Sequence, residues 1–183
     1  MSKTYSILAA GFGGQGIQFI GKQLALAGMY LNKKVTCIPS YGPEMRGGTS
    51  SCTVMISDDE IGSPVTTDPE ILITMNLPSY LKFRDTVAAG GYLFCDSSLV
   101  GEKSGRADIR AYYIPATALA YEHNMPKSAN VVMLGKLIRE TGIFTADELV
   151  MSMKKSIPES RKHLLEMNIK ALGIGYGFGV KSV

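Results

Sequence analysis

The chain has 183 residues, of which 45% are hydrophobic and 19% are charged, and its formal net charge is +3. This length suits one domain, residues 1–183, and the composition supports a packed core rather than long disorder. The small charge gives no reason to expect a nucleic-acid or membrane surface, and no apolar run reaches the roughly 18 residues of a membrane span. We therefore expect a single globular domain in the cytoplasm.

The first part of the chain predicts a strand, a helix and a second strand. Residues 5–10 form an apolar run that ends at glycine, as in a buried parallel strand. Apolar residues then recur at three- and four-residue steps over 14–31, which predicts a helix with one apolar face. Residues 34–38 predict the second strand, which ends at Pro39. Together these segments indicate a βαβ unit.

The middle of the chain predicts more strands. Residues 49–57 are alternating and β-branched, and after a turn at 58–59 we expect a short returning strand at 60–65. This pair would be a hairpin inserted into the sheet or lying beside it. Further strands are predicted at 71–75, 92–95 and 111–114, with a helix at 79–87.

The last third of the chain is predicted to be helical. Helices are expected at 117–123, 130–140, 149–155 and 158–172, and a capping box at 145–148 precedes the third of them. Residues 173–179 alternate glycine with apolar residues, so we expect no stable helix there. This tail would either pack on a partner or fray. The whole pattern predicts a doubly wound, Rossmann-like α/β fold with a mostly parallel sheet and an added β-hairpin.

The cysteines and histidines predict no metal or catalytic site. The three cysteines are too far apart in sequence for a zinc or iron–sulfur motif. Cys37 and Cys95 lie in apolar runs and are expected to be small buried residues, whereas Cys52 lies near a glycine-rich loop without a neighbouring histidine. His123 and His163 are expected on helix surfaces.

A glycine-rich turn is the first candidate site. Residues 11–16 match G-x-G-x-x-G between the first strand and the first helix. In this motif Gly11 permits the turn, Gly13 lets the backbone approach a ligand, and Gly16 lets the helix pack on the strand. Free N–H groups at the start of the helix would then face an anion. The candidate residues are Gly11, Gly13, Gly14, Gln15 and Gly16; the alternative is a tight turn that binds nothing.

The end of the second strand argues against a standard NAD site. Dinucleotide folds carry Asp or Glu about 20 residues after the glycine motif to hold the ribose hydroxyls. Here Pro39 and Ser40 occupy that place, and the nearest acid, Glu44, lies in the following loop. We therefore expect phosphate binding without NAD-type adenosine binding.

The loop over residues 41–48 is the second candidate site. It follows the second strand, so we expect it at the carboxyl edge of the sheet, on a parallel strand adjacent to the one that leads into the glycine turn. The guanidinium of Arg46 suits phosphate or carboxylate, although Glu44 could pair with it instead. The candidate residues of this loop are Glu44, Arg46, Gly47 and Gly48.

These two motifs together resemble the gamma subunit of 2-oxoacid:ferredoxin oxidoreductases. The resemblance rests on G-F-G-G-Q-G at 11–16 and Y-G-P-E-M-R-G-G at 41–48, and it extends through 61–64 to the strand that ends at Asp96. The stand-alone chain looks most like the 2-oxoglutarate type, with 2-oxoisovalerate and pyruvate types next and indolepyruvate more distant.

The resemblance implies a role within a larger enzyme. In that family thiamine diphosphate lies between alpha and beta subunits, and iron–sulfur clusters lie in a ferredoxin-like delta subunit or segment. The oxoacid is decarboxylated, electrons pass to ferredoxin and the acyl group goes to coenzyme A. The gamma subunit binds neither thiamine nor clusters and is implied to help handle coenzyme A. As an obligate subunit, it is also expected to self-associate when alone.

Two other functions compete with this interpretation. A stand-alone NAD(P)-dependent oxidoreductase would need a ribose-binding acid and a proton-transfer residue, which the sequence does not offer. A nucleotide-sensing module would share the glycine turn without needing partner subunits.

Overall fold

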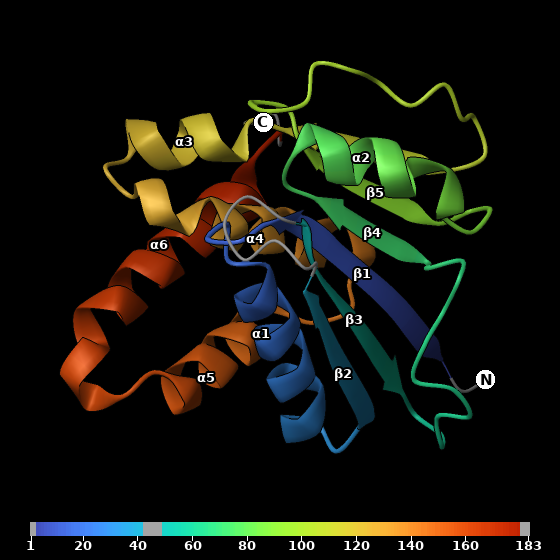
Figure 1. Ribbon diagram of the computed structural model, residues 1–183. Helices are drawn as coiled ribbons and strands as arrows, with labels where there is room; N and C mark the ends of the chain where they lie inside the picture. The colour runs from blue at the N-terminus through green and yellow to red at the C-terminus, as the bar shows by residue number, and fades with distance from the viewer. Residues whose placement is uncertain (1–2, 42–48, 180–183) are drawn as a thin grey trace.

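A mixed six-stranded sheet forms the centre of the molecule, with strand order β2-β3-β1-β4-β5-β6 (Figure 1). The computed structural model describes residues 3–41 and 49–179. The strands are β1 (Thr4–Phe12), β2 (Lys34–Tyr41), β3 (Thr49–Ser57), β4 (Ile71–Thr74), β5 (Tyr92–Asp96) and β6 (Arg110–Ile114). The helices are α1 (Ile17–Tyr30), α2 (Leu77–Phe83), α3 (Ala116–Glu122), α4 (Ala129–Thr141), α5 (Ala146–Ser156) and α6 (Lys162–Gly177). Short 3-10 turns η1 (Arg84–Thr86), η2 (Pro126–Ser128) and η3 (Glu159–Arg161) lie between them.

Helices cover both faces of the sheet, which confirms the predicted α/β class. On one face α1 and α4 pack on the strands, and α5 and α6 pack outside them (Figure 1). The main core lies in this layer and includes Ile7, Leu24 and Phe94, each fully buried. On the other face α2 covers a smaller core around Leu72 and Tyr80. No helix within residues 3–41 and 49–179 is long and apolar enough to cross a membrane.

The position of β3 differs from the prediction. β3 lies between β1 and β2 and is antiparallel to both, so β1 and β2 are not adjacent. The hairpin of the fold is therefore β2–β3, whereas residues 60–65, predicted as a returning strand, form no strand. Gly62 and Pro64 interrupt that segment, and proline cannot donate to a sheet ladder. The parallel part of the sheet consists of β1, β4, β5 and β6.

The last helix also differs from the prediction, because α6 continues through the glycine-rich segment to Gly177. A Cβ atom at Gly175 would overlap the carbonyl of Val132 on α4, and one at Gly135 on α4 would overlap the carbonyl of Leu172 on α6. Glycine at these two positions lets the two helix backbones touch. This tertiary contact offsets the low helix propensity of glycine on which the prediction rested.

The cysteines follow the prediction only in part. Cys95 on β5 is buried as expected, but Cys37 on β2 is exposed. The reason is that β2 pairs only with β3 and is the edge strand of the sheet. Cys52, on the neighbouring inner strand β3, is buried. His123 and His163 are exposed beside α3 and on α6, which agrees with their predicted surface positions.

Candidate anion-binding site

The glycine turn joins β1 to α1 at the carboxyl edge of the sheet, where the parallel strands end. The backbone is left-handed at Gly14, with φ of 92°, and at Gly16, with φ of 77°. Side-chain-bearing residues rarely adopt such angles, so these two positions require glycine. The N–H of Gln15 donates to the carbonyl of Phe12 at 3.2 Å and closes the turn.

The glycine roles predicted from the motif need correction. Close approach of helix and strand occurs at Gly11, where a Cβ would lie 2.7 Å from Cδ1 of Ile17. Gly16 instead faces α4, because a Cβ there would overlap the side chain of Asn130. Gly13 and Gly14 are exposed, so the backbone at the centre of the turn is accessible to a ligand.

The side chain of Gln15 anchors the turn to the sheet. Its Oε1 accepts from the N–H of Phe12 at 2.6 Å and from Nδ2 of Asn76 at 3.1 Å. Its Nε2 donates to the carbonyl of Met75 at 2.7 Å. The polar atoms of Gln15 are thus engaged within the protein, and this residue positions the turn while the backbone around it faces outward.

The start of α1 has the properties of an anion site. Its N-cap is Gly16, which provides no side-chain cap, and its first turn contains no acidic residue. The N–H groups of a first helical turn have no partner within the helix, and the positive end of the helix dipole adds to their attraction for anions. Nothing in the local sequence neutralises this end of α1.

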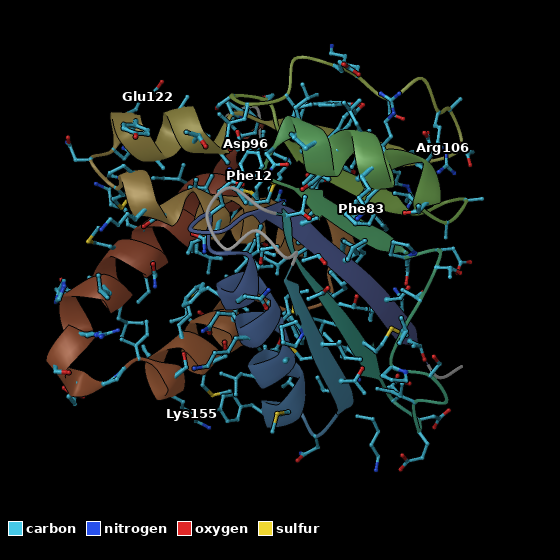
Figure 2. All side chains as sticks on the ribbon, in the orientation of Figure 1. Phe12, Phe83, Asp96, Arg106, Glu122 and Lys155 are labelled. Carbon is cyan, nitrogen blue, oxygen red and sulfur yellow. The ribbon has the colours of Figure 1, made fainter. Side chains whose placement is uncertain are left out.

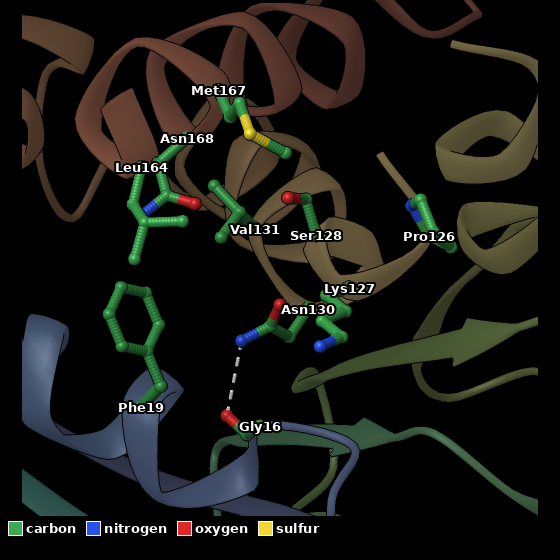
Figure 3. A pocket seen from close by; sticks show the side chains of 10 residues that line it. All are labelled: Gly16, Phe19, Pro126, Lys127, Ser128, Asn130, Val131, Leu164, Met167 and Asn168. Carbon is green, nitrogen blue, oxygen red and sulfur yellow. Dashed lines mark hydrogen bonds between the residues drawn. The ribbon is translucent and has the colours of Figure 1, made fainter. Parts of the chain in front are cut away.

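A second wall, contributed by η2 and α4, faces the turn across two cavities. A cavity of about 200 Å³ lies between Gly14, Gln15, Thr117 and Lys127. A larger, mainly apolar cavity of about 390 Å³ lies beyond Gly16, and Figure 3 shows Phe19, Leu164 and other side chains around it. Lys127 and Asn130 line both cavities.

Two residues of this wall were missed by sequence reasoning. Nδ2 of Asn130 donates to the carbonyl of Gly16 at 3.3 Å and links α4 to the turn (Figure 3). Lys127 is exposed and forms no ion pair within the part of the chain that the structure describes. A lone lysine more than 100 positions after the glycine motif carries no recognisable sequence signal. Its charge nevertheless lies on a cavity that Gly14 also lines.

The flanks of the second predicted loop reach the same edge of the sheet. β2 ends at Tyr41, and Thr49, the first residue of β3, pairs with Phe12 at the end of β1. The prediction that β1 and β2 are adjacent parallel strands was wrong, because β3 lies between them. Glu44, Arg46, Gly47 and Gly48 lie outside the described residues, so their contribution to the site stays a prediction.

The buried acid at this edge has a structural role. Asp96 ends β5, at the same end of the sheet as Phe12 (Figure 2), and is fully buried. Its carboxylate accepts from the hydroxyl of Thr117 at 2.5 Å, from the N–H of Thr117 at 3.2 Å and from the N–H of Ser98 at 3.0 Å. The two donors of Thr117 tie α3 to β5, and the N–H of Ser98 holds the segment that follows β5. Among residues 3–41 and 49–179, no group of three or more His, Cys, Asp or Glu side chains could hold a metal ion.

Sequence comparison assigns the family. Residues 6–178 match the family model described as pyruvate ferredoxin/flavodoxin oxidoreductase. The chain belongs to this family. The 2-oxoglutarate synthase subunit KorC of Methanocaldococcus jannaschii is 38% identical over 173 residues, which cover 93% of this chain and 91% of that protein. The ketoisovalerate oxidoreductase subunit VorA of Methanothermobacter thermautotrophicus is also 38% identical, over 91% of this chain but only 34% of its own length.

Solved structures agree with this assignment. The gamma subunit of a keto/oxoacid ferredoxin oxidoreductase from Geobacter sulfurreducens superposes with a TM-score of 0.82 at 27% identity, covering 95% of each chain. A 2-oxoglutarate:ferredoxin oxidoreductase from Magnetococcus marinus, solved with 2-oxoglutarate, coenzyme A and succinyl-CoA, has the same fold within 31% of its chain. Its TM-score is 0.87 and its identity 24% over 96% of this chain. The resemblance to gamma subunits expected from the two motifs is confirmed, while this chain spans about a third of the longer relatives.

Proposed function

We propose that residues 1–183 form one gamma-type subunit of a cytoplasmic 2-oxoacid:ferredoxin oxidoreductase. The chain would act only together with alpha and beta subunits, and with a ferredoxin-like delta subunit if the enzyme has one. These partners would carry thiamine diphosphate and the iron–sulfur clusters. The enzyme would decarboxylate the oxoacid, pass electrons to ferredoxin and form an acyl-CoA. The support is the family membership together with the match to KorC, a subunit of 2-oxoglutarate synthase, over nearly the whole of both chains.

The proposed substrate is 2-oxoglutarate. This choice is supported by KorC of Methanocaldococcus jannaschii, which matches over nearly its whole length. VorA matches with the same identity, so 2-oxoisovalerate is the alternative. Rates of the reconstituted enzyme with each oxoacid will decide, and a higher kcat/KM for 2-oxoisovalerate would overturn the choice.

The role proposed for this chain is to hold a phosphate group of coenzyme A at the carboxyl edge of the sheet. Coenzyme A supplies the thiol that accepts the acyl group. The observation that carries the proposal is the uncapped start of α1 at Gly16, which lines the larger cavity together with Lys127. Backbone N–H groups would bind the phosphate oxygens, Lys127 would add a cation from the opposite wall, and Arg46 is the predicted cation of the second loop.

Charge removal in the assembled enzyme tests this role. Lys127→Ala and Arg46→Ala should each remove a charge-assisted contact of about 1.5–3 kcal/mol, which raises the KM for coenzyme A roughly ten- to hundredfold. Gly13→Val should act similarly by placing a side chain between backbone and phosphate. The matched control is Lys34→Ala. Lys34 is the first residue of β2 and lies at the end of the sheet opposite the glycine turn, so this variant should leave the KM unchanged.

The outcomes separate coenzyme A binding from subunit docking. Circular dichroism should show an unchanged fold for all four variants. If neither Lys127→Ala nor Arg46→Ala changes the KM, the edge does not bind coenzyme A. Loss of assembly in the Arg46→Ala variant would instead indicate that this loop contacts the alpha or beta subunit.

The competing oxidoreductase function predicts different behaviour of the purified chain. We expect the isolated protein to be colourless and to oxidise no 2-oxoacid. We also expect it to bind NAD(H) weakly, because Pro39 and Ser40 stand where a ribose-binding acid is needed. Calorimetry with NAD(H) is the measurement. A low-micromolar Kd would favour an NAD-dependent enzyme, and purification of the native protein as a lone chain would favour the sensing module.

A further inference from the structure

Two cysteines that are 15 positions apart in sequence come into contact in the β2–β3 hairpin. The Sγ atoms of Cys37 and Cys52 are 3.5 Å apart. In the strand register Cys37 lies opposite Val54, and Cys52 lies opposite Pro39. The two residues are therefore diagonal neighbours whose side chains stand on the same face of the hairpin, and their sulfur atoms lie in contact across it.

The two thiols differ in their surroundings. Cys52 is fully buried under α1, where a Cβ at Gly21 would overlap its sulfur, and Cys37 is exposed on the edge strand. Burial, with a further contribution from the contact with Cys37, raises the pKa of the Cys52 thiol to about 12. Cys52 is therefore protonated at neutral pH and shielded from reagents, so Cys37 is the thiol that a solute can reach.

We propose that Cys37 and Cys52 form a reversible dithiol–disulfide site that reacts with low-molecular-weight disulfides of the glutathione class. The thiolate of Cys37 attacks one sulfur of the oxidant, which forms a mixed disulfide and releases the first small thiol. Cys52 then attacks Sγ of Cys37 while its proton passes to the departing small thiolate, so the protein disulfide forms and the second small thiol is released. Two protein thiols are oxidised and one small disulfide is reduced to two thiols, so protons and electrons balance.

The fold permits the small movement that bond formation needs. A disulfide requires a sulfur separation of about 2.05 Å, so the two sulfurs must approach by roughly 1.5 Å. β2 pairs with a strand on one side only, so its backbone can adjust without breaking the pairing with a second strand. The third cysteine, Cys95, is buried on β5 in the separate, smaller core. It should take no part in the reaction, which makes it an internal control.

Thiol counting on the full-length chain tests the proposal. The reduced protein is incubated with oxidised glutathione, and its free thiols are then alkylated under denaturing conditions and located by peptide mass spectrometry. We expect the number of free thiols to fall from three to one, with Cys95 alkylated and a peptide linking Cys37 to Cys52. Dithiothreitol should restore all three thiols. Because the disulfide constrains the unfolded chain, the Tm of the oxidised form should also rise.

Single variants separate the two steps. In Cys52→Ser, Cys37 should stop at a stable mixed disulfide with glutathione, and in Cys37→Ser the buried Cys52 should remain a free thiol. The matched control Cys95→Ala should still lose two thiols. The proposal is overturned if the wild-type protein accumulates only the glutathione adduct of Cys37, forms disulfides between chains or through Cys95, or retains three thiols. These readouts do not involve coenzyme A, so they are independent of the proposed function.

Discussion

At the scale of single residues, the turn depends on a glutamine that was first expected to face a ligand. Gln15 connects the end of β1 to the segment after β4 through hydrogen bonds with Phe12 and Met75. The side chain of Gln15 therefore has a physical use in this turn that a glycine could not supply. It satisfies backbone groups that the sharp turn leaves without partners in the sheet.

Removing this side chain should destabilise the protein. Gln15→Ala leaves the N–H of Phe12 and the carbonyl of Met75 without their partner, so we expect the free energy of unfolding to fall by about 1–3 kcal/mol. Urea unfolding followed by circular dichroism measures it. Lys22→Ala, an exposed change on α1 after the turn, should stay within about 0.5 kcal/mol of wild type. Equal stability of the two variants would contradict the anchoring role.

The carboxyl of Glu140 should make stability depend on acid pH. Burial raises its pKa, but hydrogen bonds from Lys136 and Tyr112 outweigh burial and hold the pKa below its usual value of 4.5. The carboxylate therefore stabilises the fold above the unfolded-state pKa, and this contribution is lost as pH falls through the folded-state pKa. Glu140→Gln should lower Tm at pH 7. The difference in Tm between this variant and wild type should be smaller near pH 3. A Tm difference between Glu140→Gln and wild type that stays constant from pH 7 to pH 3 would refute this. Glu166→Gln, which changes an exposed carboxyl, is the control.

At the scale of elements, the contact between α4 and α6 explains why glycines occur inside a helix. Gly135 and Gly175 let the two backbones approach, and each would overlap a carbonyl of the other helix if it carried a Cβ. Gly173, two positions before Gly175, is exposed with open space around it. The same helix thus contains Gly175, which packing requires, and Gly173, which packing does not require.

Alanine substitutions at Gly175 and Gly173 should change the stability of the protein in opposite directions. Gly175→Ala forces the helices apart, and overpacking of this kind costs about 1–3 kcal/mol. Gly173→Ala meets no atom and should stabilise the helix by up to about 1 kcal/mol through its higher helix propensity. Thermal unfolding of both variants is the measurement. Stabilisation by Gly175→Ala would show that the close contact is not needed.

At the scale of the whole molecule, apolar side chains remain exposed around the candidate site. Leu77 is 37%, Leu99 44% and Tyr121 66% exposed, and Leu99 and Tyr121 line the smaller cavity beside the glycine turn. Exposed apolar groups beside a cavity are typical of surfaces that bind partners. The glycine-rich segment, by contrast, lies mostly within α6, which ends at Gly177.

Without partner subunits, this surface should promote self-association. The ten methionines and nine tyrosines of the chain supply adaptable apolar contacts, so we expect a homodimer or larger assembly of the isolated protein. Light scattering over a range of concentrations measures the mass. Tyr121→Lys should shift the equilibrium toward monomer, whereas Lys34→Ala, at the opposite edge of the sheet, should not. A monomer at high concentration would contradict the expectation.

The sequence by itself determined the features that depend on neighbouring residues. The glycine turn between β1 and α1 and the capping box at Thr145 and Glu148 were both predicted, because each depends on dihedral angles and hydrogen bonds within a few positions. The motif pair also predicted the family that the comparisons assign.

Only the tertiary structure decided which distant segments meet. Strand order depends on which side chains must be buried on both faces of the sheet, so the insertion of β3 between β1 and β2 could not be read from alternation alone. The cation at Lys127, the helix contact at Gly175 and the thiol pair of Cys37 and Cys52 likewise join residues far apart in sequence. Each is a long-range contact, and local backbone preferences carry no information about such partners.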